Sequence, residues 1–140
     1  MSTLRTVALV VIAAGSLVVG VWAQGFPRSF YDDFPGMGRA WVAVDGPFNE
    51  HLVRDIGGLN LALAFVAVMA LVTGSTLLAR VTGGAALLYG LPHWVYHATH
   101  LGPYDTGDAV AMLVSLGVVV LAAVLLVTPS PTRAPTSGVA

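Results

Sequence analysis

The chain has 140 residues, of which 56% are hydrophobic and only 9% are charged, and its formal net charge at pH 7 is −1. Soluble domains carry about 25% charged residues, so a water-soluble protein of this composition would be unable to cover its apolar side chains. The charge balance offers no basic patch for nucleic acid, and the lack of cysteine excludes disulfides and thiolate metal sites. The lipid bilayer is therefore the solvent and the first partner that we expect.

The first apolar segment, Val7 to Ala23, has 17 residues without a charge, just enough to cross a hydrocarbon core of about 30 Å. A cleaved signal peptide is the rival interpretation, with Arg5 as its basic start and Val21-Trp22-Ala23 as its cleavage site. The apolar region of a signal peptide is usually shorter, about 7–15 residues. We therefore expect an uncleaved membrane span.

The stretch from Gln24 to Arg54 holds more than half of the charged residues and is rich in aromatic residues, glycine and proline. Recurrent Gly and Pro argue against one long helix, so we expect a short helical piece near Ser29 to Phe34 and a structured piece near Arg39 to Val44. Aromatic side chains gather at the headgroup level of membrane proteins. We therefore predict an aromatic loop folded over the extracytoplasmic end of the helices.

Two helices joined by a tight turn are predicted next. The first begins near Pro47 to Glu50, with proline in its first turn, and continues to about Ala79. The turn is placed at Arg80, and the second helix covers Thr82 to Thr99. Because the connection is so short, the two helices are expected to be antiparallel neighbours.

The last predicted helix covers Gly107 to Val127, and Asp105 is its expected N-cap. The fold class that follows is all-α: a four-helix transmembrane bundle over residues 1–127, with the aromatic loop between its first two helices. The tail, 128–140, is rich in Pro, Ser and Thr and is expected to be disordered.

The distribution of charge predicts that both termini are cytoplasmic. Four spans would place three arginines on each side, so the arginine count alone does not decide. With the termini inside, however, all seven acidic residues lie outside and the cytoplasmic segments are purely basic, in keeping with the positive-inside tendency. We expect a multi-pass protein of the plasma membrane.

Three of the four histidines lie in the stretch Pro92 to His100, which reads PHWVYHATH. On a helix, their spacings of four and three place them within about 60° of arc. His51 and Asp55 share a face of the preceding helix at the same end, with Arg54 close by. The predicted polar site consists of His51, Arg54, Asp55, His93, His97 and His100.

The expected turn at Arg80 also predicts how far each polar residue lies along its helix from that turn. Asp55 lies 25 residues from that turn and His97 only 17, so ideal helices would place Asp55 about 12 Å farther out. The predicted site is therefore layered: His93 and His97 lie deeper, and His100 lies near His51 or Asp55.

Two chemical interpretations of the polar site stay open. Imidazole and carboxylate groups suit divalent metals, and the metal hypothesis uses His51, Asp55, His93 and His97 as ligands. The alternative is a network without metal, in which Arg54 and Asp55 orient the imidazoles. No glutamate lies between the histidines as in a zinc-protease motif, and the sequence leaves open whether the protein is an enzyme. Asn60 is expected to hydrogen-bond to the first or the last of the four helices.

The segments FYDDFPGMGRAWVAVDGPFNEHLVRDIGGLNLALA (Phe30 to Ala64) and LPHWVYHATHL (Leu91 to Leu101) resemble a family of small four-span bacterial integral membrane proteins. The resemblance covers about Val7 to Val127, implies a four-helix membrane fold and supplies no activity. More distantly, the four-span layout is similar to that of DoxX-like proteins.

The leading functional interpretation is a small integral membrane protein with a His-rich polar site at the extracytoplasmic end, acting with a membrane protein partner. A metal-dependent membrane enzyme or metal-binding protein is the second. A DoxX-like accessory subunit of a membrane redox complex is the third.

Overall fold

The computed structural model describes residues 1–129, which form four long helices, one short helix and a two-stranded antiparallel hairpin. In chain order the elements are α1 (Thr3–Gly25), α2 (Pro27–Asp33), β1 (Pro35–Gly36), β2 (Arg39–Ala40), α3 (Glu50–Thr73), α4 (Thr76–Thr99) and α5 (Thr106–Val127). The proposed disordered tail lies outside the described residues, except for Thr128 and Pro129.

Side-chain caps fix where three of the long helices begin. Asn49 accepts a hydrogen bond from the Leu52 N–H at 3.1 Å, and α3 starts where the sequence predicted. Asp105, the expected N-cap of α5, accepts from the Asp108 N–H at 2.9 Å. Ser75 caps α4 in the same way, although the sequence analysis did not assign it that role.

The turn between α3 and α4 lies at Gly74 and Ser75, so the predicted turn at Arg80 is wrong. Gly74 has a φ of 64°, the left-handed conformation that ends helices and that glycine adopts without a steric penalty. Arg80 instead lies inside α4. Counted from Gly74, Asp55 and His93 are each 19 residues away, so the difference in depth that predicted a layered site disappears.

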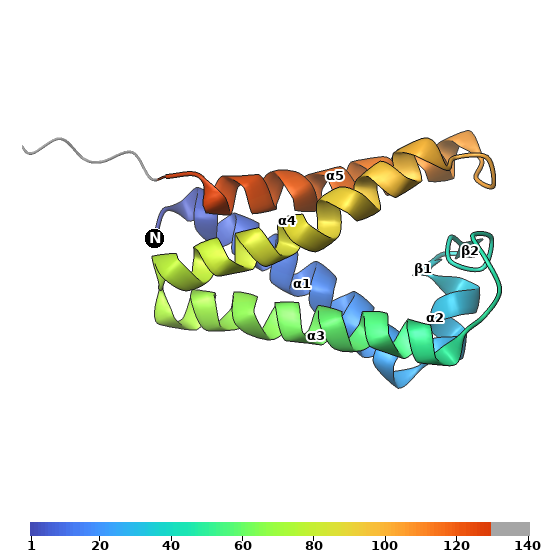
Figure 1. Ribbon diagram of the computed structural model, residues 1–140, viewed down its shortest axis with the longest axis horizontal. Helices are drawn as coiled ribbons and strands as arrows, with labels where there is room; N and C mark the ends of the chain where they lie inside the picture. Colours follow the sequence, from blue (N-terminus) through green and yellow to red (C-terminus); the bar gives the residue numbers. More distant parts are fainter. Residues whose placement is uncertain (130–140) are drawn as a thin grey trace, which may run out of the picture.

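The four long helices pack as two close pairs, α1 with α3 and α4 with α5. Figure 1 shows α3 and α4 diverging from their shared turn. The main apolar core joins all four helices and consists of Ala8, Leu9, Ile12, Ala13, Ala67, Ala70, Ala79, Ala86, Ala122, Ala123 and Leu126. It lies toward the end where α1 begins and α5 finishes, here called the terminal end.

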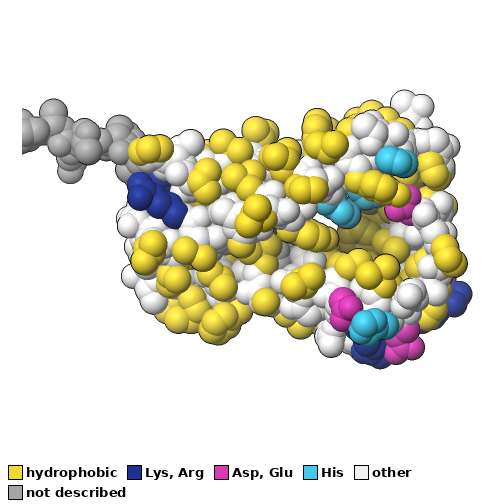
Figure 2. Space-filling view, viewed as in Figure 1, with side chains coloured by type: hydrophobic (Ala, Val, Ile, Leu, Met, Phe, Trp, Pro, Cys, Tyr) yellow, Lys and Arg dark blue, Asp and Glu magenta, His cyan; other side chains and the backbone are white. Residues whose placement is uncertain are grey.

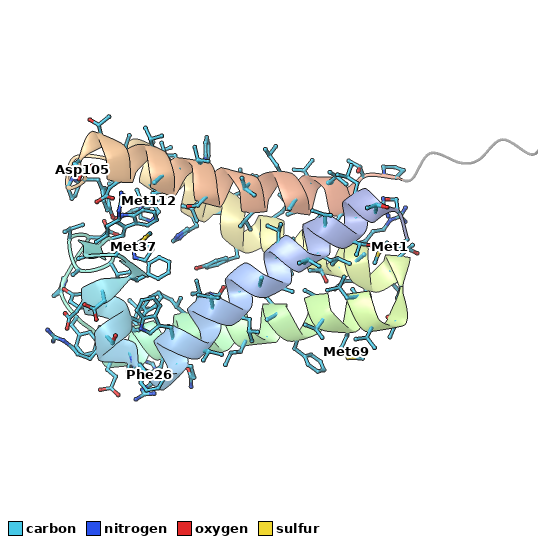
Figure 3. All side chains as sticks on the ribbon, turned by 180° about the vertical axis from the view of Figure 1, so that it is seen from behind. Met1, Phe26, Met37, Met69, Asp105 and Met112 are labelled. Atoms are coloured by element: carbon cyan, nitrogen blue, oxygen red, sulfur yellow. The ribbon has the colours of Figure 1, made fainter. Side chains whose placement is uncertain are left out.

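Residues 26–49, here called the cap, fold over the opposite, capped end. The rings of Phe30 and Phe34 lie 4.8 Å apart, and Trp22 of α1 packs edge-on against both at 6.0 and 5.9 Å. Phe30 is buried together with Val53 of α3. Seen from behind in Figure 3, Met37 of the cap and Met112 of α5 both lie at the capped end. These aromatic contacts hold α2 against α1 and α3.

Three helices, α1, α3 and α5, are long and apolar enough to cross a membrane, which indicates a membrane-embedded protein. The prediction of an all-helical protein with membrane-spanning helices is confirmed to this extent. α4 is as long as α3, at 24 residues, but it is not among the three apolar helices. It carries Arg80, His93 and His97, which make it more polar.

Charged side chains are distributed unequally between the two ends. The acidic residues all lie in the cap or at the capped ends of helices: Asp32, Asp33, Asp45, Glu50, Asp55, Asp105 and Asp108. Among residues 1–129, the terminal end carries only Arg5 and Arg80, and Figure 2 shows basic but no acidic side chains there. Arg5 is buried and donates to the Thr128 carbonyl, which ties α1 to the end of α5.

Candidate functional site

A column of aromatic rings runs along α4 toward the capped end. Tyr89, His93 and His97 are four residues apart, and successive ring centroids are separated by 5.5 and 4.8 Å. The spacing of four keeps the rings on one helix face, as the sequence predicted for the two histidines. The column ends beneath the cap, where His97 is only 9% exposed.

Tyr104, in the loop between α4 and α5, covers His97. Its ring packs edge-on against the His97 imidazole, with the centroids 6.0 Å apart. Its hydroxyl donates a hydrogen bond to the Trp41 carbonyl in the cap, at 3.0 Å. Burial, with a contribution from the carboxylate of Asp45, raises the pKa of Tyr104 to about 12. Tyr104 is therefore a neutral donor throughout the physiological range.

Two further side-chain contacts attach the cap to the helices. The Tyr96 hydroxyl on α4 donates to the Asp45 carboxylate at 3.4 Å. Arg39 of β2 forms an ion pair with Asp108 in the first turn of α5. Together with the Tyr104 hydrogen bond, these contacts close the cap over the end of the α4 column.

Two buried polar atoms at the capped end have no hydrogen-bond partner in the described structure: Nδ1 of His97, beneath the cap, and Nε1 of Trp41, within it. Leaving a buried polar atom unpaired costs about 1–3 kcal/mol. Such atoms in native proteins are usually satisfied by a protein group, an ordered water or a ligand. These six residues, His93, His97, Tyr96, Tyr104, Trp41 and Asp45, are here called the capped site, and two of them carry a buried nitrogen without a partner.

His100 contacts its own helix. Its ring stacks on Tyr96 with the centroids 4.2 Å apart, and its Nδ1 lies 2.8 Å from the Tyr96 carbonyl oxygen. The described structure gives it no hydrogen bond or ion pair with His51 or Asp55. The contacts of His100 thus lie at the end of its own helix, and the prediction that it joins His51 or Asp55 gains no contact in its support.

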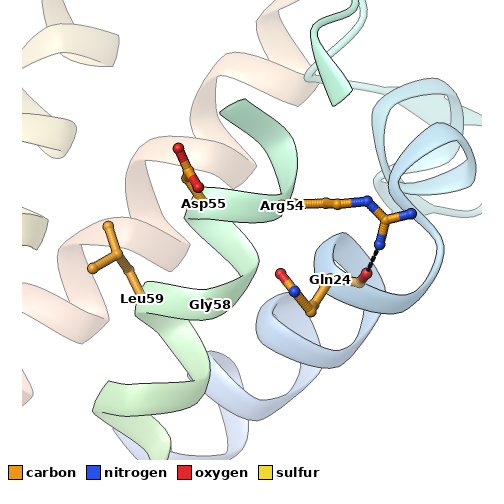
Figure 4. Close-up of a pocket in the computed structure, with 5 residues that line it drawn as sticks. All are labelled: Gln24, Arg54, Asp55, Gly58 and Leu59. Carbon is orange, nitrogen blue, oxygen red and sulfur yellow. Dashed lines mark hydrogen bonds between the residues drawn. The ribbon is translucent and has the colours of Figure 1, made fainter. Parts of the chain in front are cut away.

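The three predicted residues of α3 form a separate, exposed group. His51 Nε2 lies 3.5 Å from the Asp55 carboxylate, with the two side chains 88% and 55% exposed. Arg54 pairs with Glu50 at 2.9 Å and also donates to the Gln24 carbonyl at the end of α1. Figure 4 shows Arg54 reaching toward Gln24 while Asp55 points away from it. A shallow pocket of about 430 Å³ is lined by Gln24, Arg54, Asp55, Gly58 and Leu59.

The structure thus divides the predicted polar site in two. Figure 2 shows histidine atoms in two places, beside acidic and basic side chains at the end of α3 and, separately, on α4. Among residues 1–129, no group of three or more His, Asp or Glu side chains is placed to hold a metal ion. The fold therefore does not bring His51, Asp55, His93 and His97 together as ligands of one metal ion.

A groove of about 290 Å³ lies between α3 and α4. It is lined by Leu59, Asn60, Ala62, Leu63, Val66, Val81, Ala85 and Tyr89. Figure 2 shows the surface hollowed between these helices, with histidines bordering the hollow on the α4 side. Asn60 donates to the Ile56 carbonyl of its own helix at 2.9 Å. The expected bond of Asn60 to α1 or α5 is not among the hydrogen bonds of the described residues.

Trp41, Asp45 and Tyr104 belong to the site although the sequence does not predict it. Their positions in irregular segments carry no periodicity from which a facing direction could be read. The one available signal was proximity along the chain, since Tyr104 lies seven residues after His97 and directly follows a helix break.

No protein-family model, curated protein or solved structure matches this chain. The assignment of function therefore rests on the geometry of the site.

Proposed function

We propose that the protein is a four-span integral membrane protein whose capped end is a binding site for a small hydrogen-bonding molecule. The four-span part of the proposal follows from connectivity. α3 and α4 are joined by two residues, and α4 and α5 by six. If α3 and α5 both cross the bilayer, α4 has to return through it, despite its lower hydropathy. The four long helices then form a transmembrane bundle.

We place the capped end outside the cell and both termini in the cytoplasm, in the plasma membrane. This orientation is supported by the charges: the terminal end carries Arg5 and Arg80 without acidic residues, in keeping with the preference for basic cytoplasmic segments. The acidic capped end then faces the exterior. Met37, at the tip of the hairpin, is 93% exposed. In this orientation its apolar side chain would be available outside the cell to a membrane-bound or soluble protein partner.

One observation carries the binding proposal: the buried Nδ1 of His97 has no partner, and it lies under a cap that other polar contacts hold closed. An occupant with a carbonyl, hydroxyl or water-like oxygen would satisfy such atoms. The imidazole either donates or accepts, depending on its tautomer. The site thus suits an oxygen-bearing molecule that pairs with His97.

Native mass spectrometry of the protein released from membrane vesicles tests this proposal. We expect a small molecule bound to the wild-type protein, and its loss in His97→Phe, which keeps an aromatic ring but removes both nitrogen atoms. His51→Phe is the matched control, because His51 is 88% exposed and lies outside the capped site. Binding that survives in His97→Phe, or a wild-type protein without any bound molecule, would contradict the proposal.

A further inference from the structure

The lining of the groove between α3 and α4 would suit an amphiphilic molecule. Of the eight residues that line it, only Asn60 and Tyr89 have hydrogen-bonding side chains, and none is charged. Both lie toward the capped end of the groove, while Val66 and Val81 lie toward the turn at Gly74. The groove is thus polar at one end and apolar along the rest of its length.

The groove opens toward the surface that would face lipid. Leu59 is 66% exposed and Val81 is 50% exposed, so its rims are not covered by another helix. By contrast Asn60, on its floor, is only 7% exposed. A lipid molecule reaches this groove by moving sideways in the bilayer, without passing the closed cap.

The two polar side chains lie deep in the proposed span. Asn60 is ten residues from the start of α3 and Tyr89 is ten residues from the end of α4, which places each about 15 Å below the capped ends. That depth is about half of a hydrocarbon core of roughly 30 Å. Polar groups at such a depth are costly in lipid and usually serve a specific contact.

We infer that the groove binds a neutral, membrane-dissolved lipid whose head carries a carbonyl or hydroxyl oxygen, with the head at Asn60 and Tyr89 and the chain along Leu63, Val66 and Val81. The absence of charged lining residues selects a neutral head, and a groove of about 290 Å³ holds a ring-sized head with part of a chain. The inference rests on the proposed function, because it supplies that binding site with a ligand class and an entry route.

The tyrosine that lines the groove also connects it to the capped site. Tyr89 stacks on His93 with ring centroids 5.5 Å apart, and His93 contacts His97 at 4.8 Å. A head group that extends one helical turn beyond Tyr89 therefore meets the imidazoles of the capped site. The groove is the lipid-side entrance to that site, and the cap closes it from water.

Four probes added to the purified full-length protein in detergent test the ligand class, with apparent Kd values read from native mass spectra. They are a decyl-substituted benzoquinone with a carbonyl head, farnesol with a hydroxyl head, dodecane without a head, and palmitate as a charged head. We expect at least one of the neutral oxygen-headed probes to bind about tenfold or more tightly than dodecane and palmitate. Binding of the quinone alone, of farnesol alone, or of both identifies which oxygen chemistry the site accepts.

Variants locate the binding. Ala85→Phe fills the groove from α4 and Ala62→Phe fills it from α3; both residues are exposed, so neither change crowds the core. We expect each to weaken the oxygen-headed probe about tenfold, whereas Val72→Phe, on the lipid face of α3 and outside the groove, keeps wild-type affinity. The double variant Asn60→Leu with Tyr89→Phe should bind the oxygen-headed probe no better than dodecane.

Equal affinity for dodecane and the oxygen-headed probes, or wild-type affinity in both phenylalanine variants, overturns the inference. These results are independent of the test with His97→Phe. A bound molecule lost in His97→Phe, combined with no effect of Ala62→Phe or Ala85→Phe, would leave the proposed binding site standing and remove only the lipid-side entrance.

Discussion

Gly57 of α3 lies directly against the backbone of Gln24 at the end of α1. A Cβ atom at position 57 would lie 2.5 Å from the Gln24 amide nitrogen and 2.9 Å from its Cα, closer than real Cβ atoms approach other atoms. At the neighbouring Gly58, the nearest atom to a Cβ would be the Gln24 side-chain oxygen at 3.9 Å, an ordinary contact. The two adjacent glycines therefore have different roles, and of the two it is Gly57 that permits the close approach of α1 and α3.

Gly57→Ala should destabilise the protein by about 1–3 kcal/mol. The added methyl group would clash with the backbone of Gln24, which does not move aside as a flexible side chain does, so α1 and α3 would have to separate. Gly58→Ala is the matched control and should be neutral or stabilising by up to about 1 kcal/mol, through helix propensity. Unfolding in detergent micelles by added dodecyl sulfate, followed by circular dichroism, gives both free energies. Equal effects of the two substitutions would contradict this account of the α1–α3 contact.

The same asymmetry recurs between α4 and α5. A Cβ at Gly83 would lie 2.7 Å from the Leu126 Cβ and 2.8 Å from the Ala123 carbonyl oxygen, whereas one at Gly84 would meet nothing within 4 Å. Gly83→Ala should therefore lower the free energy of unfolding by about 1–3 kcal/mol, and Gly84→Ala should leave it unchanged or raise it. If Gly84→Ala proved the more damaging of the two in the same assay, the rotation of α4 against α5 would be wrong.

The helical membrane class was predictable from the sequence, but the position of the turn between α3 and α4 was not predicted correctly. Composition and the length of the apolar segments predict the helical membrane class, because the thickness of the bilayer sets how many apolar residues a transmembrane helix needs. The predicted turn between α3 and α4 rested on the charge of Arg80, whereas the chain turns at Gly74-Ser75. That pair combines a C-terminal glycine with an N-cap, which are the stronger local signals.

The candidate site was predicted only in part, for a physical reason. Periodicity fixes which residues of one helix share a face, so the alignment of His93 with His97 followed from their spacing. It does not fix how two helices diverge. α3 and α4 separate after their turn, and His51 and Asp55 end on an exposed surface instead of beside the α4 histidines. The cap, which has no periodicity, then supplies the groups that cover His97.

The Arg39–Asp108 ion pair should keep the cap closed. The Asp108 side chain is only 18% exposed, so this pair is better shielded than most surface pairs. Loss of the pair is expected to cost about 1 kcal/mol and to raise the open fraction of the cap roughly fivefold. In Asp108→Asn, trypsin should therefore cleave after Arg39 roughly five times faster, as followed by mass spectrometry of the solubilised protein.

Asp32→Asn is the control for this experiment. It breaks an i,i+4 pair with Arg28 that lies within α2 and is 67% and 40% exposed, so it does not join the cap to another helix. Cleavage after Arg39 should keep its wild-type rate in that variant. A rate that rises equally in both variants would show that the Asp108 contact has no special part in closure.

Tyr104 predicts a stability change at alkaline pH. Its pKa is raised from the ordinary 10.0 to about 12, first by burial and then by Asp45. Because the folded-state pKa is the higher one, the stabilisation by the neutral hydroxyl is fully present below pH 10 and is lost as the pH rises through about 12. Ultraviolet absorbance of tyrosinate should contain a phase with a midpoint near pH 12 that Tyr104→Phe removes and Tyr31→Phe retains. A wild-type titration without that phase would show that the Tyr104 hydroxyl is not buried beneath the cap.

Single cysteines can establish the orientation and the number of spans, because the natural chain contains no cysteine. Met37→Cys in the cap and Gly102→Cys between α4 and α5 mark the capped end, whereas Ser2→Cys and Thr76→Cys mark the terminal end; all four positions are exposed. In intact cells, a membrane-impermeant maleimide should label only the first pair, and permeabilised cells should expose all four thiols. Labelling of Met37→Cys without Gly102→Cys would mean that α4 does not cross the bilayer. Labelling of the terminal pair instead of the capped pair would invert the proposed orientation, and the acidic cap would then face the cytoplasm.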